Sequence, residues 1–305
     1  LGADGYKAAE APAARSYPGA VLTVRGGFSW SRDKLPYSVT DSDPESLFTI
    51  DRGRGGMVDA DLVVQSPYRG IALQLGVNHV RVSREGSTDT PLDNGCYILT
   101  FLGLISDCQD RTDVQSRISK ASVDALLSWQ PFDGRAFTLL LGPTYLKLRE
   151  RNDSQFLYPG GFENFVTRET DVKGFGVKAG IQHTVQVMRG VALTGAVTGS
   201  IIDAERDIDV RDVETFGGGI NQQQAARLSN SKTVLAWDAR IGLLHDFPLL
   251  GKGASLEWGV KYDQIQDVLF TKNLVAPDQP VGFYGTDKGD FSTWSGYVGV
   301  KVPLW

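Results

Sequence analysis

Residues 289–305 (GDFSTWSGYVGVKVPLW) alternate apolar and polar side chains with hardly a break. A period of two places Trp294, Val298 and Leu304 on one face and Lys301 on the other. In lipid a sheet must close on itself, because an open edge leaves backbone N–H and C=O groups without partners. A long strand with one apolar face suits that requirement, so we expect residues 289–305 to close a transmembrane barrel.

Along the chain, short and long connections alternate between the segments of alternating apolar and polar residues. Short turns fall at 66–70, 131–134, 187–190 and 247–253. Long polar segments fall at 32–56, 83–118, 150–168, 208–230 and 271–289. Outer-membrane barrels sort their loops in this way, with short periplasmic turns and long extracellular loops. The pattern predicts an all-β fold: one up-and-down antiparallel barrel of ten strands at 20–305, after a flexible periplasmic arm at 1–19.

One segment does not fit this alternation. Residues 97–106 (YILTFLGLIS) are continuously apolar inside a predicted extracellular loop. They are interpreted as a loop hairpin or short helix, or as an extra strand that would make twelve. Cys96 and Cys108 flank the segment, and an even count at close spacing favours a local disulfide in an oxidising compartment over two unpaired thiols.

Composition excludes several classes of protein. The chain has 35 glycines in 305 residues and lacks an apolar run of eighteen, so it does not cross a membrane with helices. A net charge of -5 argues against nucleic acid as a partner. The sequence begins at Leu1 without a leader, and we expect a mature chain whose signal peptide has been removed. These features predict the bacterial outer membrane, with both termini periplasmic.

Charged side chains of both signs occupy the face opposite the apolar one. One interpretation is an ion pathway. The other, which we favour, is that the charges pair and fill a lumen that ten strands leave narrow. The predicted lumen charge network is Arg25, Asp59, Asp61, Asp124, Lys178, Asp238, Arg240, Glu257, Lys261, Asp263 and Lys301.

A basic cluster is predicted at the extracellular ends of three strands. Arginine suits phosphate, so the cluster could contact the anionic lipopolysaccharide of the outer leaflet. The alternative is a solvated rim balanced by Glu150, Asp153, Glu169 and Asp171. The candidate rim residues are Arg81, Arg84, Lys147, Arg149, Arg151, Arg168 and Lys173.

Residues that would support catalysis are sparse. The chain has three histidines, and His183 and His245 fall near the short turns, away from the extracellular rim. His79 lies in the outer half of its strand without a Ser or Asp that marks a site. The acidic run at 203–212 contains Arg206 and Arg211 and matches no calcium loop. We expect no enzyme, no cofactor and no metal site.

Two stretches are similar to a known family: GFGVKAG at 174–180 with the strand at 191–202, and 236–305 with WDARIG and GVKYD. In these stretches the chain resembles the Legionella-type family of major outer-membrane proteins. The resemblance implies a porin-like or surface-protein barrel. The end is also similar to the signal read by the barrel-assembly machinery, at Tyr297, Gly299, Val302, Leu304 and Trp305.

Together these features predict a structural or surface-interaction role with a narrow or plugged lumen. The alternative is a porin-like channel for ions or small solutes. Expected partners are outer-membrane lipid and lipopolysaccharide, the assembly machinery, and surface-layer or homo-oligomeric contacts through the loops.

Overall fold

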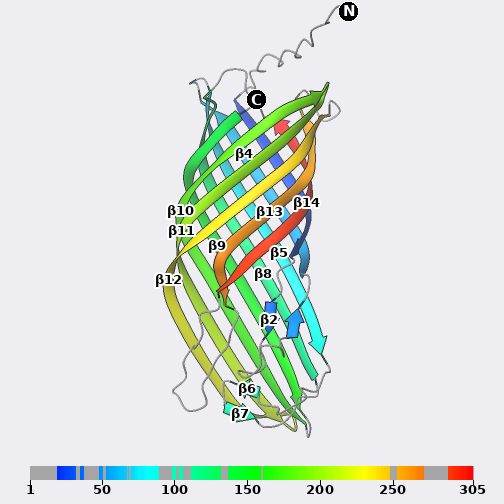
Figure 1. The fold of residues 1–305 in the computed structure, drawn as a ribbon, viewed down its shortest axis with the longest axis vertical. Helices are drawn as coiled ribbons and strands as arrows, with labels where there is room; N and C mark the ends of the chain where they lie inside the picture. Colours follow the sequence, from blue (N-terminus) through cyan, green and yellow to red (C-terminus); the bar gives the residue numbers. More distant parts are fainter. Residues whose placement is uncertain are drawn as a thin grey trace, which may run out of the picture.

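The chain folds into a closed barrel of ten long antiparallel strands (Figure 1). The computed structural model describes residues 19–31, 35–37, 48–50, 53–66, 68, 70–88, 98–100, 103–105, 111–131, 137–158, 161–247, 253–270 and 288–304. No helix in these ranges is long and apolar enough to cross a membrane. The predicted all-β, ten-stranded, up-and-down barrel is confirmed.

Each barrel strand pairs with its neighbours along the chain. The strands are β1 (Ala20–Ser31), β4 (Gly53–Gln65), β5 (Ile71–Thr88), β8 (Arg111–Trp129), β9 (Phe137–Tyr158), β10 (Phe162–Met188), β11 (Val191–Phe216), β12 (Gly219–Asp246), β13 (Ser255–Phe270) and β14 (Lys288–Pro303). Strand β14 closes the barrel against β1, in a register that runs from Val21↔Pro303 to Trp30↔Trp294. The alternating segment at 289–305 is therefore the closing strand.

Two short hairpins lie outside the barrel sheet. Strand β2 (Leu35–Tyr37) pairs with β3 (Phe48–Ile50), and β6 (Ile98–Thr100) pairs with β7 (Gly103–Ile105). The apolar segment at 97–106 thus contributes a hairpin. Neither the helix nor the twelve-stranded alternative holds.

The short connections share one rim of the barrel with the described ends of β1 and β14. At this rim Gln130 N–H donates to Gly70 O (2.8 Å), and Leu304 N–H donates to Ala20 O (2.9 Å). Gly70 and Gly190 adopt φ values of 74° and 78°, a left-handed conformation that glycine tolerates. The turns at Gly70 and Gly190 therefore fall where the spacing predicted them, whereas 132–136 and 248–252 lie outside the described residues.

In the opposite half of the barrel, two segments that were predicted to be loops are mostly strand. Segments 150–168 and 208–230, expected as polar loops, are mostly strand, because β9 to β12 run for 22, 27, 26 and 28 residues. The β9–β10 ladder reaches Phe162↔Tyr158, and a tight turn at Gly217–Gly218 closes the β11–β12 hairpin. A membrane crossing needs about 9–11 residues, and 27 residues span about 90 Å. These segments looked like loops because polar residues occupy both of their faces.

We call this polar half the extension: residues 83–88, 111–119, 147–158, 162–173, 203–216 and 219–233. Strand also occupies the edges of three other predicted loops, since β4 begins at Gly53, β5 ends at Thr88 and β8 begins at Arg111. The arm at 1–18, most of the loop at 271–289, and both Cys96 and Cys108 lie outside the described residues.

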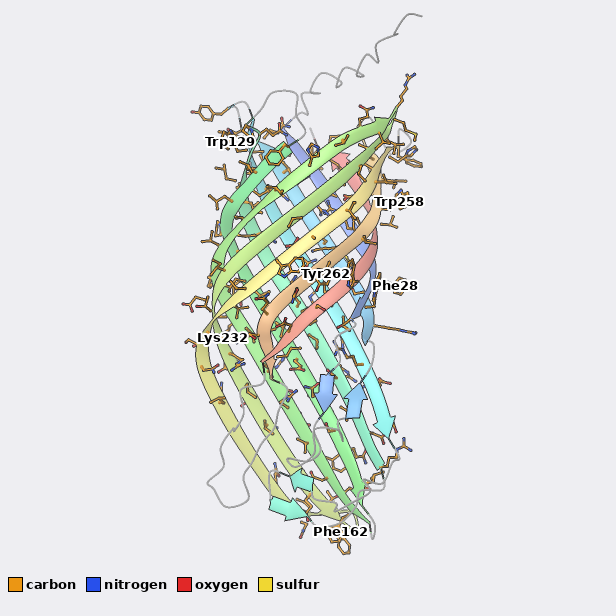
Figure 2. The ribbon with its side chains drawn as sticks, in the orientation of Figure 1. Phe28, Trp129, Phe162, Lys232, Trp258 and Tyr262 are labelled. Atoms are coloured by element: carbon orange, nitrogen blue, oxygen red, sulfur yellow. The ribbon has the colours of Figure 1, made fainter. Side chains whose placement is uncertain are left out.

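On the other half, the outward face carries an apolar belt. Phe28, Phe175 and Val298 are 82%, 72% and 63% exposed, whereas inward Asp263 is fully buried. Aromatic rings lie at the border with the extension, where Tyr262 contacts Trp237 and Trp294 at centroid distances of 4.9 and 4.8 Å. Trp129 lies toward the short-turn rim and Phe162 at the tip of the extension (Figure 2). Exposed apolar residues of the belt include Val24, Val58, Leu75, Val77, Val123, Leu127, Leu141, Val177, Ile181, Val197, Ile201, Leu235, Ile241, Trp258 and Val260.

Candidate functional site

Arg25 occupies the centre of the lumen. Its Nη1 atom lies 2.6 Å from both Asp59 Oδ1 and Asp61 Oδ2, and its Nε lies 2.8 Å from Glu257 Oε2. These carboxylates come from β4 and β13, on either side of the β1–β14 pair. Arg240 on β12 approaches the same groups, at 3.6 Å from Asp61. The two guanidinium groups, each with several donors, thus cross-link four strands (β1, β4, β12 and β13) through the interior.

A second set of ion pairs lies beside the first. Lys178 Nζ is 2.9 Å from Asp124 Oδ2 and 3.0 Å from Asp238 Oδ2. Lys261 extends the first set toward Asp263, because its Nζ lies 3.4 Å from Asp59 and 3.5 Å from Asp263. The predicted inward charges are therefore brought together, and Lys301 lies on the same inward face of β14, opposite Thr23 and Ser255.

Two members of this interior were missed from the sequence. Lys120 forms an ion pair with Asp263, but strand four was expected to begin near residue 122. Tyr297 was assigned to an assembly signal, yet it faces inward and donates its hydroxyl to Glu257 Oε1 at 3.0 Å. With Lys120 the charge network holds six cations (Arg25, Lys120, Lys178, Arg240, Lys261, Lys301) and six carboxylates (Asp59, Asp61, Asp124, Asp238, Glu257, Asp263), so it is formally neutral.

An apolar layer lies on the extension side of the charge network. Phe291, Ile265 and Leu148 are inward-facing and fully buried. Ile118 and Ile265 are two residues beyond Lys120 and Asp263 on the same strands, so the layer lies directly on the charges. The apolar layer comprises Ile118, Leu146, Leu148, Val172, Ile202, Ala204, Val234, Ile265, Val268, Leu269 and Phe291.

Little space remains inside the lumen. A cavity of about 60 Å³ lies among Asp59, Lys120, Lys178, Asp238 and Lys261. That volume holds a few water molecules. Among the described residues, paired charges and the apolar layer together fill the cross-section of the barrel.

The predicted basic rim divides between the two faces of the sheet. Arg84 and Arg168 point inward and are 2% and 5% exposed, so they cannot contact outer-leaflet lipid. Arg84 donates to Ser31 Oγ, and Arg168 lies 3.7 Å from Glu150. Both residues are even-numbered, like the lumen-facing residues of β5 and β10. Their inward direction was missed because the strands were assumed to end at the rim.

Four of the five outward members of this rim pair with acids, and the fifth is Arg81. Arg151 lies 2.9 Å from Asp153 and 3.1 Å from Glu169, and Arg149 lies 3.4 Å from Glu169. The other two pairs are Lys147 with Asp171 at 3.9 Å and Lys173 with Glu205 at 3.3 Å. Partial burial tends to raise the pKa of Asp153, but hydrogen bonds from Arg151 and Thr167 and the Arg151 charge outweigh it, so this pKa lies below its ordinary value.

Three other arginines form an unbalanced row at the border of the apolar belt. Arg54, Arg81 and Arg117 are exposed on the outward face of β4, β5 and β8. Ser83 of β5 lies opposite Arg54 on one side and Arg117 on the other, and Arg81 is two residues from Ser83 on the same strand. The three arginines are therefore close together on neighbouring strands. Arg117 donates to Gln115 Oε1 at 2.8 Å, and among the described side chains none of the three forms an ion pair. We call them the arginine arc; Arg54 and Arg117 were missed because they fell in predicted loops.

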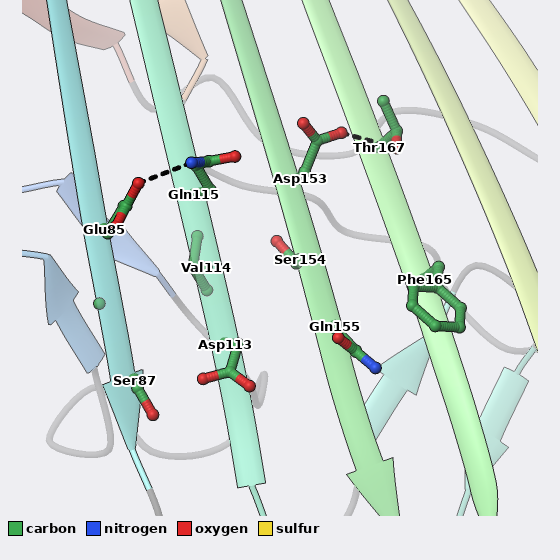
Figure 3. A pocket seen from close by; sticks show the side chains of 11 residues that line it. Glu85, Ser87, Asp113, Val114, Gln115, Asp153, Ser154, Gln155, Phe165 and Thr167 are labelled. Carbon is green, nitrogen blue, oxygen red and sulfur yellow. Dashed lines mark hydrogen bonds between the residues drawn. The ribbon is translucent and has the colours of Figure 1, made fainter.

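A cleft of about 580 Å³ is hollowed in the outward face of the extension. Its side chains stand on β5, β8, β9 and β10 (Figure 3). Gln115 donates to Glu85 at 2.7 Å, and Thr167 donates to Asp153 at 3.0 Å. Within the described ranges no three acidic, His or Cys side chains are grouped to hold a metal ion. Its carboxylates are engaged in hydrogen bonds, so the cleft offers a polar surface.

The predicted assembly-signal residues divide by parity. Tyr297 and Gly299 face the lumen, and Leu304 is outward at 43% exposure. Val302 pairs with Leu22 in the β1–β14 ladder. Trp305 lies outside the described residues.

Comparisons with known proteins show no family for this chain. No family model and no curated protein matches the chain. Among solved structures it is similar to the outer membrane protease OmpT from Escherichia coli, at 7% identity and TM-score 0.43 over 95% of this chain and 98% of that one. It is similar to a major outer membrane protein from Thermus thermophilus, at 12% identity and TM-score 0.32 over 92% and 98%.

A further similarity is to the RagAB peptide transporter, at 10% identity and TM-score 0.32 over 81% of this chain. The chain spans 42% of the length of that transporter chain. No activity or ligand follows from similarity this low. The Legionella-type resemblance stays a prediction.

Proposed function

We propose that this chain is an outer-membrane barrel that is closed to solutes and presents its extension at the cell surface as a structural or interaction scaffold. The observation that carries this proposal is the filled lumen. Arg25 is held by three carboxylates, and Phe291 and the rest of the apolar layer lie on the extension side of these charges. The described residues form a barrel with an apolar outer belt on one half and a packed interior.

The outward apolar belt supports the membrane assignment. Side chains such as Phe28 and Phe175 are more than two-thirds exposed, and water is a poor solvent for a continuous band of this kind. A closed sheet with alternating faces and aromatic residues at its border is the arrangement that lipid accepts. The extension carries charges on its outward face, so it projects into water beyond the lipid.

The charge network supports closure. Moving an unpaired ion into a low-dielectric interior costs several kcal/mol, so buried charges persist when they are paired. A conducting pore would require water to separate Lys178 from Asp124 and Asp238, and to wet the apolar layer as well. We therefore favour a closed lumen over a porin-like channel for ions or small solutes.

Planar-bilayer recording separates these two functions. The purified protein, with heat-modifiable migration as a check on folding, is expected to insert into lipid without a steady open state. A large, stable conductance would reject the closed lumen and favour the porin-like alternative. Extraction without detergent would reject the membrane assignment.

The arginine arc supports a lipid partner. Arg54, Arg81 and Arg117 lie just beyond the apolar belt, where the proposed membrane position would bring anionic headgroups, and guanidinium groups bind phosphate well. We propose that they bind lipopolysaccharide phosphate, and that Lys147, Arg149, Arg151 and Lys173 contribute less because acids neutralise them. The assembly machinery and surface-layer or homo-oligomeric contacts remain proposed partners.

Native mass spectrometry with a defined lipopolysaccharide tests this partner. The triple substitution Arg54→Gln, Arg81→Gln and Arg117→Gln is expected to reduce retained lipid by about tenfold or more, since each charge-assisted bond contributes about 1.5–3 kcal/mol. The matched control is Arg149→Gln with Arg151→Gln, which should change binding much less. Equal losses in both variants would contradict the role of the arc.

A further inference from the structure

About half of strand β12 pairs with a neighbouring strand on one side only. β11 pairs with β12 along nearly its full length, from Val191↔His245 to Phe216↔Gly219. β13 pairs with β12 only between Ala236↔Ile265 and Asp246↔Ser255. β13 then bulges at 266–268, where Asp267 takes φ 57°, and continues along β14. Figure 1 shows β12 running on past the end of β13 along the margin of the extension.

The direction of the backbone groups along this margin follows from two hydrogen bonds. Asp246 N–H donates to Gly190 O at 2.8 Å, on the β11 side. Phe247 N–H donates to Ala254 O at 2.9 Å, on the β13 side. N–H and C=O groups alternate sides along a strand, and the β11–β12 register has no shift between residues 222 and 245. The odd-numbered residues of β12 therefore point their backbone groups toward the open side at 223, 225, 227, 229, 231 and 233.

We call these six positions the β12 edge. Within the described part of the chain, the N–H and C=O groups of these residues, which point to the open side of β12, have no backbone partner. Their side chains are exposed as well. The edge therefore offers a row of donors and acceptors in water.

The sequence of the edge lacks the usual protection against strand addition. Proteins guard long edges with proline, bulges or clustered charge. Residues 222–233 (QQQAARLSNSKT) contain no proline and carry charge only at Arg227 and Lys232. Lys232 is already engaged, because its Nζ donates to Asp267 O at 2.7 Å. Among the described residues, nothing pairs with this edge.

We propose that the β12 edge binds an extended polypeptide segment of another protein as an added strand, by backbone hydrogen bonding of the β-augmentation type. The segment should place a carboxylate opposite Arg227, whose guanidinium reaches Asp207 and Asp209 only at 3.7 Å and keeps donors available. This inference rests on the proposed surface location of the extension.

A second copy of the chain in the same membrane does not fit this edge. Barrel strands tilt about 35–45° from the membrane normal. A two-fold axis along the normal would therefore cross two β12 edges at about 70–90°. Strands at that angle cannot form a ladder, whereas a flexible segment can align with the edge.

The probe is a synthetic peptide with the sequence of residues 205–215, ERDIDVRDVET. In β11 these residues already match β12 across their shared ladder, with Asp209 opposite Arg227. The labelled peptide is added to the purified full-length barrel in lipid nanodiscs, and binding is followed by fluorescence anisotropy. Hydrogen exchange is expected to show new protection of the odd-numbered amides at the edge. A peptide methylated on alternate backbone nitrogens should not bind.

Ser229→Pro with Ser231→Pro removes two edge donors at positions where proline leaves the β11 ladder intact. Peptide affinity should fall by about tenfold or more, given two lost hydrogen bonds. Ser229→Ala with Ser231→Ala keeps the donors and should bind like the wild type. Equal binding by the proline variant, or no binding by the wild type, would overturn the proposal. Heat-modifiable migration and nanodisc insertion, recorded on the same samples, report separately on the membrane assignment.

Discussion

Arg25 and Glu257 meet in the lumen with Nε and Oε2 2.8 Å apart, although 232 residues separate them in the sequence. Both side chains are buried, at 5% and 3% exposure. The contact joins β1 to β13 across β14, so it depends on closure of the barrel. It also holds the charge in a region that water does not enter freely.

Arg25→Met should therefore destabilise the barrel strongly. The substitution leaves Asp59, Asp61 and Glu257 without their main partner, and breaking a buried pair costs about 3–5 kcal/mol. Guanidinium unfolding in detergent measures the loss. Arg111→Met is the control, because its pair with Asp113 is exposed and contributes about 0–1 kcal/mol. An equal effect of the two substitutions would argue against a packed ionic lumen.

The second prediction concerns the apolar layer and compares a phenylalanine on the inward face of the barrel with one on the outward face. Phe291→Ala removes a fully buried ring and should lower the free energy of unfolding by about 3–5 kcal/mol. Phe28→Ala removes a ring that is 82% exposed on the belt, and in detergent it should cost far less. Similar losses would mean that the layer is not a packed core. The charge network should keep the Phe291→Ala barrel closed in bilayer recordings.

The sequence predicted the half of the barrel that lies against lipid, because only there does one face have to be apolar. The closing strand was found from its alternation, and the inward charges from the opposite parity. The extension has no such constraint: Thr167 faces outward and Arg168 inward, both polar, so residues 150–168 resembled a loop. The apolar layer was missed for a related reason, since Ile118 fell at the end of the predicted loop 83–118 and Phe291 lies near the start of β14, where neighbouring residues are polar.

Packing around Tyr297 gives a third prediction. A Cβ atom on Gly242 would lie 2.5 Å from the Tyr297 hydroxyl oxygen, so Gly242→Ala must displace that ring and its hydrogen bond to Glu257. The expected cost is about 1–3 kcal/mol. Adding Tyr297→Phe should recover part of the loss, which a double-mutant cycle measures. Gly199→Ala is the control, because a Cβ there meets nothing within 4 Å.

The acid response of the extension provides the last prediction. The folded-state pKa of Asp153 lies below the ordinary 3.8, so ionised Asp153 stabilises the β9–β10 hairpin at every pH above that value. This contribution should be lost as the pH falls through the folded-state pKa, and hydrogen exchange near Thr167 should then accelerate. Arg151→Gln removes a donor and a charge while leaving the partial burial that favours the neutral acid. The Asp153 pKa, followed by carboxyl NMR, should therefore rise in that variant. An unchanged pKa would show that Arg151 does not hold Asp153 in its ionised form.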